Sequence, residues 1–251
     1  MTVHREPAAS LEHGAEARLA ERRVANSPAP RAADALREHR ARLLPRSERL
    51  RSLRLDVTDP ESIRAAVEES GPVDVLVNNA GVGLLGAFEA TPMATIREVF
   101  ETNTFGVMAL TQALIPRFRE RRAGVIVNVT SSATLAPMPL VAVYTASKTA
   151  VEGFTASLAH ELAEFDVRVK LVEPGYCPNT RFAENGGPRM QGLLPQSYAA
   201  YAERIFASYA GQKAFTRESD VAEAVWRAAN DTTGQVHFPA GAYAAALGAA
   251  R

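Results

Sequence analysis

The chain has 251 residues, 47% hydrophobic and 22% charged, so it can bury a substantial core and is not disordered throughout. Its formal net charge of zero excludes a global electrostatic attraction to nucleic acid or to an acidic membrane. The single cysteine, Cys177, excludes an internal disulfide and a multi-cysteine metal site, and we expect no metal. No apolar run reaches the roughly 18 residues that span a bilayer, so we expect a cytoplasmic protein.

The N-terminal segment differs from the rest in charge. Residues 1–54 contain twelve arginines, no lysine and seven acidic residues, a net charge of +5. Alanine-rich patterns predict helices at 11–23 and 31–44 with a break at 27–30, and no strand. Because acidic residues are mixed among the arginines, we interpret the segment as a solvated helix face rather than a nucleic-acid arm.

From about residue 51 the chain alternates short apolar runs with longer helical patterns. Strands are expected at 53–57, 73–77, 124–129, 167–172 and 235–238, and helices at 60–69, 91–121, 143–164 and 219–229. This alternation predicts an α/β fold, a Rossmann-like doubly wound parallel sheet with helices on both faces. Ligands of such sheets bind beyond the carboxyl ends of the strands, where Asp56, Asn79, Ser131 and Gly175 follow.

Two residues in the helix at 143–164 suggest acid–base chemistry. Tyr144 and Lys148 are four positions apart, so they share one face of the helix. An ammonium group near a phenol favours the phenolate and lowers the pKa of the phenol. A tyrosine in this setting can exchange a proton near neutral pH. Alone, the pair is also compatible with an ordinary surface pair on an amphipathic helix.

Further motifs surround this pair in chain order. They are Leu55-Asp56-Val57, Asn78-Asn79-Ala80-Gly81, Asn103, Val129-Thr130-Ser131-Ser132, Tyr144-Thr145-Ala146-Ser147-Lys148 and Pro174-Gly175. Each is weak by itself, but together, in this order and spacing, they are specific. Over roughly residues 51–240 the chain resembles the short-chain dehydrogenase/reductase superfamily.

The resemblance implies four catalytic positions. Tyr144 would exchange the proton of the carbonyl or alcohol oxygen, and Ser131 would hydrogen-bond that oxygen. Lys148 would lower the pKa of Tyr144 and bind the nicotinamide ribose. Asn103 would kink its helix and hold a water that links Lys148 to bulk solvent. For the hydroxyl, Thr130 or Ser132 remains an alternative to Ser131, which the thirteen-residue spacing to Tyr144 favours.

The resemblance also implies a cofactor, NAD or NADP, and the residues that bind it. Besides Tyr144 and Lys148, these positions are Asp56, Val57, Asn79, Ala80, Gly81, Pro174 and Gly175. Asp56 and Val57 would bind the adenine, Asn79 would lie along the adenosine ribose, and Pro174 and Gly175 would flank the nicotinamide. Two plainer readings stay open, in which Asp56 only caps the helix that follows and the asparagines only form a turn.

One part of the family pattern is missing. Family members begin with a strand and a glycine-rich turn that binds the pyrophosphate, whereas Gly14 is the only glycine before Gly71 here. We therefore expect the N-terminal strand and turn to be absent or distorted. A divergent N-terminus, an altered reading frame, or loss of cofactor binding would each explain this.

The predicted function is an NAD(P)-dependent oxidoreductase that acts on a carbonyl or secondary alcohol. The alternative is a catalytically impaired homologue that binds a ligand or a partner. The segment 176–217, rich in large apolar side chains, is predicted to be a mobile substrate loop with a hinge at Gly186-Gly187-Pro188. We therefore expect a partly apolar small-molecule substrate.

We also predict a homodimer or homotetramer, and neither nucleic-acid nor membrane partners. In relatives, the helices that correspond to 91–121 and 143–164 pair between subunits. An apolar stripe of Val151, Phe154 and Leu158 recurs at helical spacing in the second of these helices. This stripe could serve the core alone, or the core and a subunit interface together.

Overall fold

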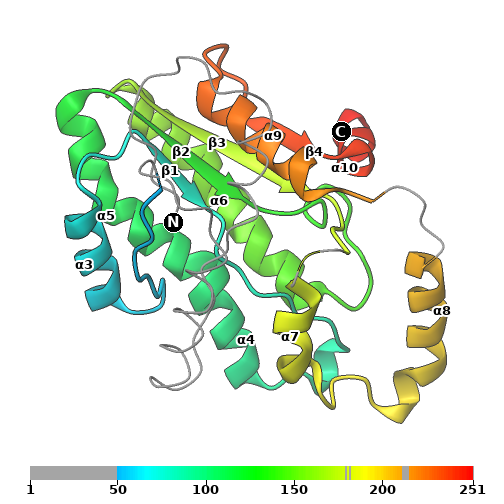
Figure 1. The fold of residues 1–251 in the computed structure, drawn as a ribbon. Helices are drawn as coiled ribbons and strands as arrows, with labels where there is room; N and C mark the ends of the chain where they lie inside the picture. The colour runs from blue at the N-terminus through cyan, green and yellow to red at the C-terminus, as the bar shows by residue number, and fades with distance from the viewer. Residues whose placement is uncertain (1–49, 179, 181, 211–214, 251) are drawn as a thin grey trace.

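The computed structural model describes residues 50–178, 180, 182–210 and 215–250. Its centre is a four-stranded parallel sheet in the order β1 (Val75–Asn78), β2 (Gly124–Val129), β3 (Val167–Pro174) and β4 (His237–Ala240) (Figure 1). The carboxyl ends of all four strands therefore lie at one edge of the sheet. The predicted helices at 11–23 and 31–44, and the glycine turn expected to be missing, fall outside the described residues.

Helices cover both faces of the sheet. On one face α3 (Pro60–Ser70), α5 (Gly106–Arg121) and α6 (Ala142–Ala163) pack over Leu76 and Ile126. On the other face α9 (Glu218–Asn230) packs over Val127 and Phe238. The side chains of β2 alternate between these two cores, as the two-residue period of a strand requires. This arrangement confirms the predicted Rossmann-like α/β fold.

The predicted helix at 91–121 is divided into shorter pieces. A 3-10 turn (Phe88–Ala90) is followed by α4 (Met93–Phe100), which starts after Pro92. A π-helical turn (Glu101–Phe105) then joins α4 to α5. Such π turns interrupt the regular hydrogen-bond ladder and often occur at functional sites. Asn103 lies in the middle of this turn.

The strand predicted at 53–57 is wrong, although Leu55 and Val57 are buried as expected. The backbone of Asp56 is used in a turn and not in the sheet: its N–H donates to Ser62 Oγ and its C=O accepts from Asp59 N–H. Asp59 in turn caps α3 through its side chain, as the sequence indicates. A strand needs a paired neighbour, and these hydrogen bonds take that pairing away.

The segment at 176–217 contains helices. They are α7 (Phe182–Met190), a 3-10 turn (Gln196–Tyr198) and α8 (Ala199–Ala210) (Figure 1). The hinge predicted at Gly186-Gly187-Pro188 is wrong, because these residues lie inside α7. Packing explains part of this: the bare backbone of Gly186 lets α7 approach the carbonyl oxygen of Gly83.

The chain ends with α10 (Ala242–Ala249), which packs against β4. Over the described ranges, no helix combines the length and the apolar character that crossing a membrane requires.

Candidate active site

The loop that follows β1 brings two predicted catalytic residues together. A Cβ built on Gly81 would lie 3.3 Å from Asn103 Oδ1 and 3.3 Å from Lys148 Nζ. These side chains come from the π-helical turn and from α6, which are distant in sequence. A side chain at this position would be in tight contact with both groups. The predicted positions Gly81, Asn103 and Lys148 therefore form one cluster.

Asn103 holds this loop in place. The residue is fully buried, and its amide oxygen accepts a hydrogen bond from Val82 N–H at 2.8 Å. Its amide nitrogen donates to Val82 C=O at 2.9 Å and to Ser147 Oγ at 3.0 Å. The Ser147 hydroxyl donates onward to the carbonyl oxygen of Tyr144. Asn103 thus connects the loop after β1 to the first turn of α6.

Lys148 is a buried cation. Its side chain is almost fully buried, and Nζ donates to the carbonyl oxygen of Val129 at 3.0 Å. Burial disfavours the ammonium and lowers the pKa of Lys148 to about 8. Lys148 is therefore mostly protonated and positively charged at neutral pH, but its pKa lies only about one unit above neutral pH.

Tyr144 lies one helical turn before Lys148 and is hydrogen-bonded through its side chain to Ser131. Burial raises the pKa of Tyr144 to about 12, the Ser131 hydrogen bond opposes this, and the nearby Cys177 adds to it. The sequence predicts that Lys148 lowers this pKa, but burial dominates. Tyr144 is consequently a protonated phenol at neutral pH.

The structure distinguishes the three hydroxyls that follow β2. Ser131 contacts Tyr144, whereas Thr130 Oγ1 donates to the carboxylate of Glu152 at 3.4 Å. Ser132 donates its backbone N–H to the carbonyl oxygen of Pro174 at 2.7 Å. Among these three, Ser131 is therefore the hydroxyl beside the phenol.

The Ser132 hydrogen bond also brings Pro174-Gly175 to the same edge of the sheet as Ser131. Gly175 is buried and donates its N–H to Ala240 C=O at 3.2 Å. The Thr216 hydroxyl lies close to the space where a Cβ on Gly175 would be. Gly175 is thus fixed at the end of β3, with no side chain between it and the segment before α9.

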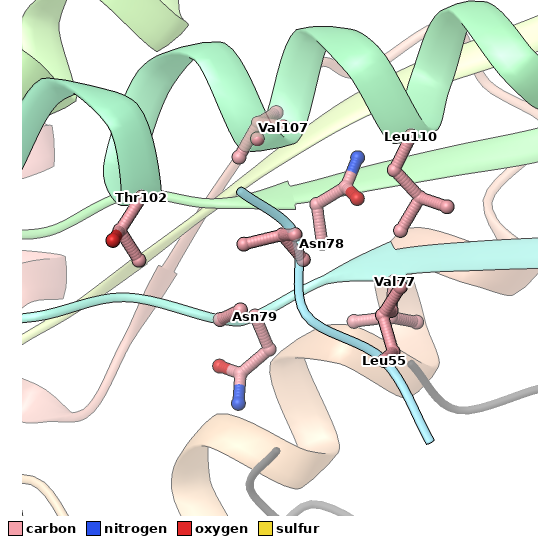
Figure 2. A pocket seen from close by; sticks show the side chains of 10 residues that line it. Leu55, Val77, Asn78, Asn79, Thr102, Val107 and Leu110 are labelled. Carbon is pink, nitrogen blue, oxygen red and sulfur yellow. The ribbon is translucent and has the colours of Figure 1, made fainter. Parts of the chain in front are cut away.

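Two of the three predicted adenosine residues, Val57 and Asn79, line a small pocket beside the end of β1, which Figure 2 shows, whereas Asp56 does not line it. Its lining comes from the turn before α3, the end of β1 and the start of α5, and comprises Leu55, Val57, Val77, Asn78, Asn79, Ala80, Thr102, Gly106, Val107 and Leu110. Val57 packs against Gly106, where a side chain would clash with it. The pocket is mostly apolar.

The two asparagines of the Asn78-Asn79 motif have different roles. Asn78 is buried and donates to Asn128 Oδ1 at 2.8 Å and to Thr111 Oγ1 at 3.0 Å. Asn79 is exposed, and in Figure 2 its side chain points in a different direction from that of Asn78. Asn78 is therefore a structural link between β1, β2 and α5, and Asn79 is the member of the motif that a ligand can reach.

Asp56 forms a turn and does not cap the following helix, which its plainer reading expected, because Asp59 is the N-cap of α3. Its Oδ1 accepts from the N–H of Thr58 at 2.9 Å and from the Thr58 hydroxyl at 2.7 Å. The backbone of Asp56 still lies between the pocket residues Leu55 and Val57.

Sequence reasoning missed one contact of Tyr144. The ring of Phe182, at the start of α7, meets the ring of Tyr144 edge to face, with centroids 5.7 Å apart. The two residues lie 38 positions apart, and no motif links them. The apolar composition of the segment 176–217 was the only signal, and it did not distinguish Phe182 from the other aromatic residues there.

Together, the parallel sheet and the residues at its carboxyl edge define a nucleotide-binding α/β protein with a tyrosine–lysine pair at its centre. The model of the family described as short chain dehydrogenase matches residues 14–190. The chain belongs to this family. The match begins well before residue 51, where the motifs of the sequence place the start of the resemblance.

Relatives agree with this assignment. An uncharacterized oxidoreductase of Schizosaccharomyces pombe is 31% identical over 81% of this chain and 86% of its own length. A short-chain dehydrogenase of Streptomyces avermitilis superposes with a TM-score of 0.69 at 32% identity, covering 85% of this chain and 77% of the other. A Burkholderia phymatum short-chain dehydrogenase/reductase, crystallised in complex with NAD, gives a TM-score of 0.64 at 27% identity over 83% and 74% of the two chains.

Proposed function

We propose that the protein is an NAD(P)-dependent oxidoreductase that interconverts a carbonyl compound and a secondary alcohol. The observation that carries the proposal is the Tyr144 phenol, hydrogen-bonded to Ser131 and one helical turn from the buried cation of Lys148. Membership of the short-chain dehydrogenase family and the NAD-bound relative of Burkholderia phymatum support it. NAD and NADP both remain candidates, because the region that selects between them lies outside the described residues.

The residues present fit a dinucleotide. The pocket beside β1 offers an apolar surface and the exposed amide of Asn79 for the adenosine part. At Gly81 the bare backbone leaves Lys148 Nζ close to the loop, from where it would bind the ribose hydroxyls of the nicotinamide part. Gly175, at the end of β3, would flank the nicotinamide. When bound, the nicotinamide supplies or accepts the hydride.

The protein's own residues would handle the proton. With a pKa of about 12, Tyr144 carries its proton at neutral pH, which suits donation to a carbonyl oxygen during reduction. Ser131 would hold the same oxygen through its hydroxyl. In the direction of oxidation the alcohol proton would return to Tyr144, and the cation of Lys148 would favour the phenolate that accepts it. Asn103 would hold the loop at Gly81 in a fixed position relative to Lys148.

We further propose that the substrate is partly apolar. Tyr144 packs beside a buried apolar cluster of Val82, Leu84, Val99, Val143 and Leu193, and the Phe182 ring covers it from α7. A charged substrate group in these surroundings would lose its hydration without a partner. Neutral ketones or alcohols with an apolar body fit the site better.

Self-association through α5 and α6 is also part of the proposal, as a homodimer or homotetramer. Val151 and Leu158 are buried in the core, so the apolar stripe on α6 serves packing and carries no argument for an interface. Support comes instead from Phe105, which is 52% exposed at the end of the π-helical turn that leads into α5. Light scattering at tens of micromolar tests this, and a monomer alone would contradict it.

The experiment that tests the function follows the oxidation of NADH and of NADPH at 340 nm with a panel of neutral ketones. Turnover with one or both cofactors, and formation of the matching secondary alcohol, is the expected result. Absence of turnover with both cofactors across the panel, while the protein is folded, would contradict the proposed function.

A further inference from the structure

The loop after β1 carries three glycines, and each of them is approached by a side chain from a distant element. Gly81 faces Asn103 and Lys148, Gly83 faces Phe182 of α7, and Gly86 faces Leu193, which follows α7. The loop thus contacts the catalytic helix at one glycine and the α7 segment at the other two. Phe182, the residue that approaches Gly83, also contacts Tyr144.

Phe182 contacts both Gly83 and Tyr144. A Cβ on Gly83 would lie 2.8 Å from Cε1 and 3.1 Å from Cζ of Phe182, and its three nearest atoms all belong to this ring. The same ring meets Tyr144 edge to face at 5.7 Å and 64°. The ring therefore fills the space that a side chain at position 83 would take.

The glycine contact is reinforced from the same helix. A Cβ on Gly186 would lie 3.1 Å from the carbonyl oxygen of Gly83. Residues 182 and 186 are one helical turn apart, so α7 rests on Gly83 along one face. Further along the chain, Ala87 N–H donates to the carbonyl oxygen of Leu193 at 2.8 Å. The position of the Phe182 ring is therefore fixed by the backbone on which α7 rests.

We infer that Phe182, seated on Gly83, forms the wall of the substrate site beside Tyr144 and sets the size of the apolar group next to the reacting carbon. This inference rests on the proposed function and deepens it. Because the reacting oxygen must reach the Tyr144 phenol, a substrate's substituents must fit beside the ring that covers this phenol. Phe182 is a specificity-determining residue and takes no part in the proton transfer.

The two contacts of the ring predict a specific coupling between positions 83 and 182. Gly83→Ala leaves too little room for the Phe182 ring in its present position and displaces it within the site, so we expect kcat/KM for bulky ketones to fall about tenfold more than for small ones. Phe182→Ala removes the wall, so we expect the preference to shift about tenfold towards bulky ketones. In the Phe182→Ala background no ring lies next to position 83, so Gly83→Ala should change kcat/KM neither for bulky nor for small ketones.

The experiment is a double-mutant cycle of Gly83→Ala and Phe182→Ala, measured as kcat and KM over ketones of increasing size. Phe182→Leu serves as a second variant that keeps an apolar side chain. Phe206→Ala, an exposed aromatic on α8, is the matched control for the phenylalanine, and Gly153→Ala, with no atom within 4 Å of its Cβ, is the control for the glycine. Both controls should leave the size preference unchanged.

Thermal unfolding of the four proteins of the cycle (the parent, the two single variants and the double variant) tests the contact between Gly83 and Phe182 without any turnover. Gly83→Ala should lower the melting temperature in the parent chain and not in the Phe182→Ala background. If Gly83→Ala has equal effects in both backgrounds, on the melting temperature or on kcat/KM, the inferred coupling between Gly83 and Phe182 is wrong. If Phe182→Ala and Phe182→Leu leave the preference for ketone size unchanged, Phe182 does not limit the size of the substrate. If the parent chain reduces no ketone, the proposed function and the role of Phe182 in the substrate site are both contradicted. The contact between Gly83 and Phe182 is then tested by thermal unfolding alone.

Discussion

Asn103 binds the backbone of Val82 at both of its polar groups, accepting from the N–H at 2.8 Å and donating to the C=O at 2.9 Å. A primary amide can do this because its oxygen accepts while its nitrogen donates. The loop that carries Gly81 is thereby fixed to the π-helical turn, next to Lys148. Activity and stability should both depend on this single side chain.

We predict that Asn103→Ala lowers the free energy of unfolding by about 3 kcal/mol, since it leaves two buried backbone groups without partners. Urea unfolding measures this loss. Ser147→Ala is the control, because it removes one hydrogen bond of Asn103 and leaves the Val82 contacts, and should cost about 1 kcal/mol. Equal losses in the two variants would contradict a special role for the Val82 contacts.

Tyr144→Phe should lower kcat by a factor of about 10² to 10⁴, the usual contribution of a positioned proton donor. The change removes only the phenol oxygen and its hydrogen bond to Ser131, so the free energy of unfolding should change by only about 1 kcal/mol. Turnover of ketones is the measurement, with Tyr201→Phe on α8 as a matched tyrosine substitution. Parental turnover by Tyr144→Phe would show that another group transfers the proton.

Lys148 makes stability depend on pH in a defined direction. Burial lowers the pKa of Lys148 from 10.5 to about 8, so between these values the unfolded chain holds a proton that the folded chain has lost. Stability therefore rises with pH across this window. At 1.36 kcal/mol per pKa unit, the parent chain should gain on the order of 3 kcal/mol relative to Lys148→Met between pH 8 and pH 10.5.

Urea unfolding of the parent and of Lys148→Met at several pH values measures this gain. Other groups titrate equally in the two proteins and cancel in the difference. A stability difference that stays constant from pH 8 to pH 10.5 would mean that burial does not perturb Lys148.

Leu193 and Leu194 are neighbours with different surroundings. Leu193 is 4% exposed, belongs to the cluster with Val82 and Leu84, and packs onto Gly86, whereas Leu194 is only partly buried. Leu193→Ala should therefore cost about 2–5 kcal/mol of stability, and Leu194→Ala clearly less. Thermal or urea unfolding of both variants checks this, and equal losses would show that the segment after α7 is not anchored through Leu193.

Dinucleotide affinity should be weak compared with relatives that carry the full glycine turn, because Gly14 is the only glycine before Gly71. Calorimetric titration with NAD and with NADP measures the affinity. Asn79→Ala should weaken binding further if the pocket beside β1 receives the adenosine part. Low-micromolar or tighter binding by the parent chain would contradict this prediction.

The pattern of the sequence was enough to predict the class of fold, and its motifs proposed most residues of the candidate site. Alternating apolar periods predict a parallel sheet because helices and strands bury their faces with different repeats. The carboxyl ends of parallel strands meet at one edge, so Ser131 and Gly175 could be assigned to one site before any coordinates. The spacing of Tyr144 and Lys148 placed both on one helix face, because the geometry of a helix is local.

Contacts between residues that are distant in the sequence could not be predicted from local patterns. Residues 53–57 read as a strand, yet the backbone N–H and C=O of Asp56 are bonded within the turn before α3. The pKa of Tyr144 rises, against the expectation from Lys148, because burial depends on everything packed around the phenol. Phe182 reaches Tyr144 only because Gly83 leaves room for its ring, and no local pattern records that space.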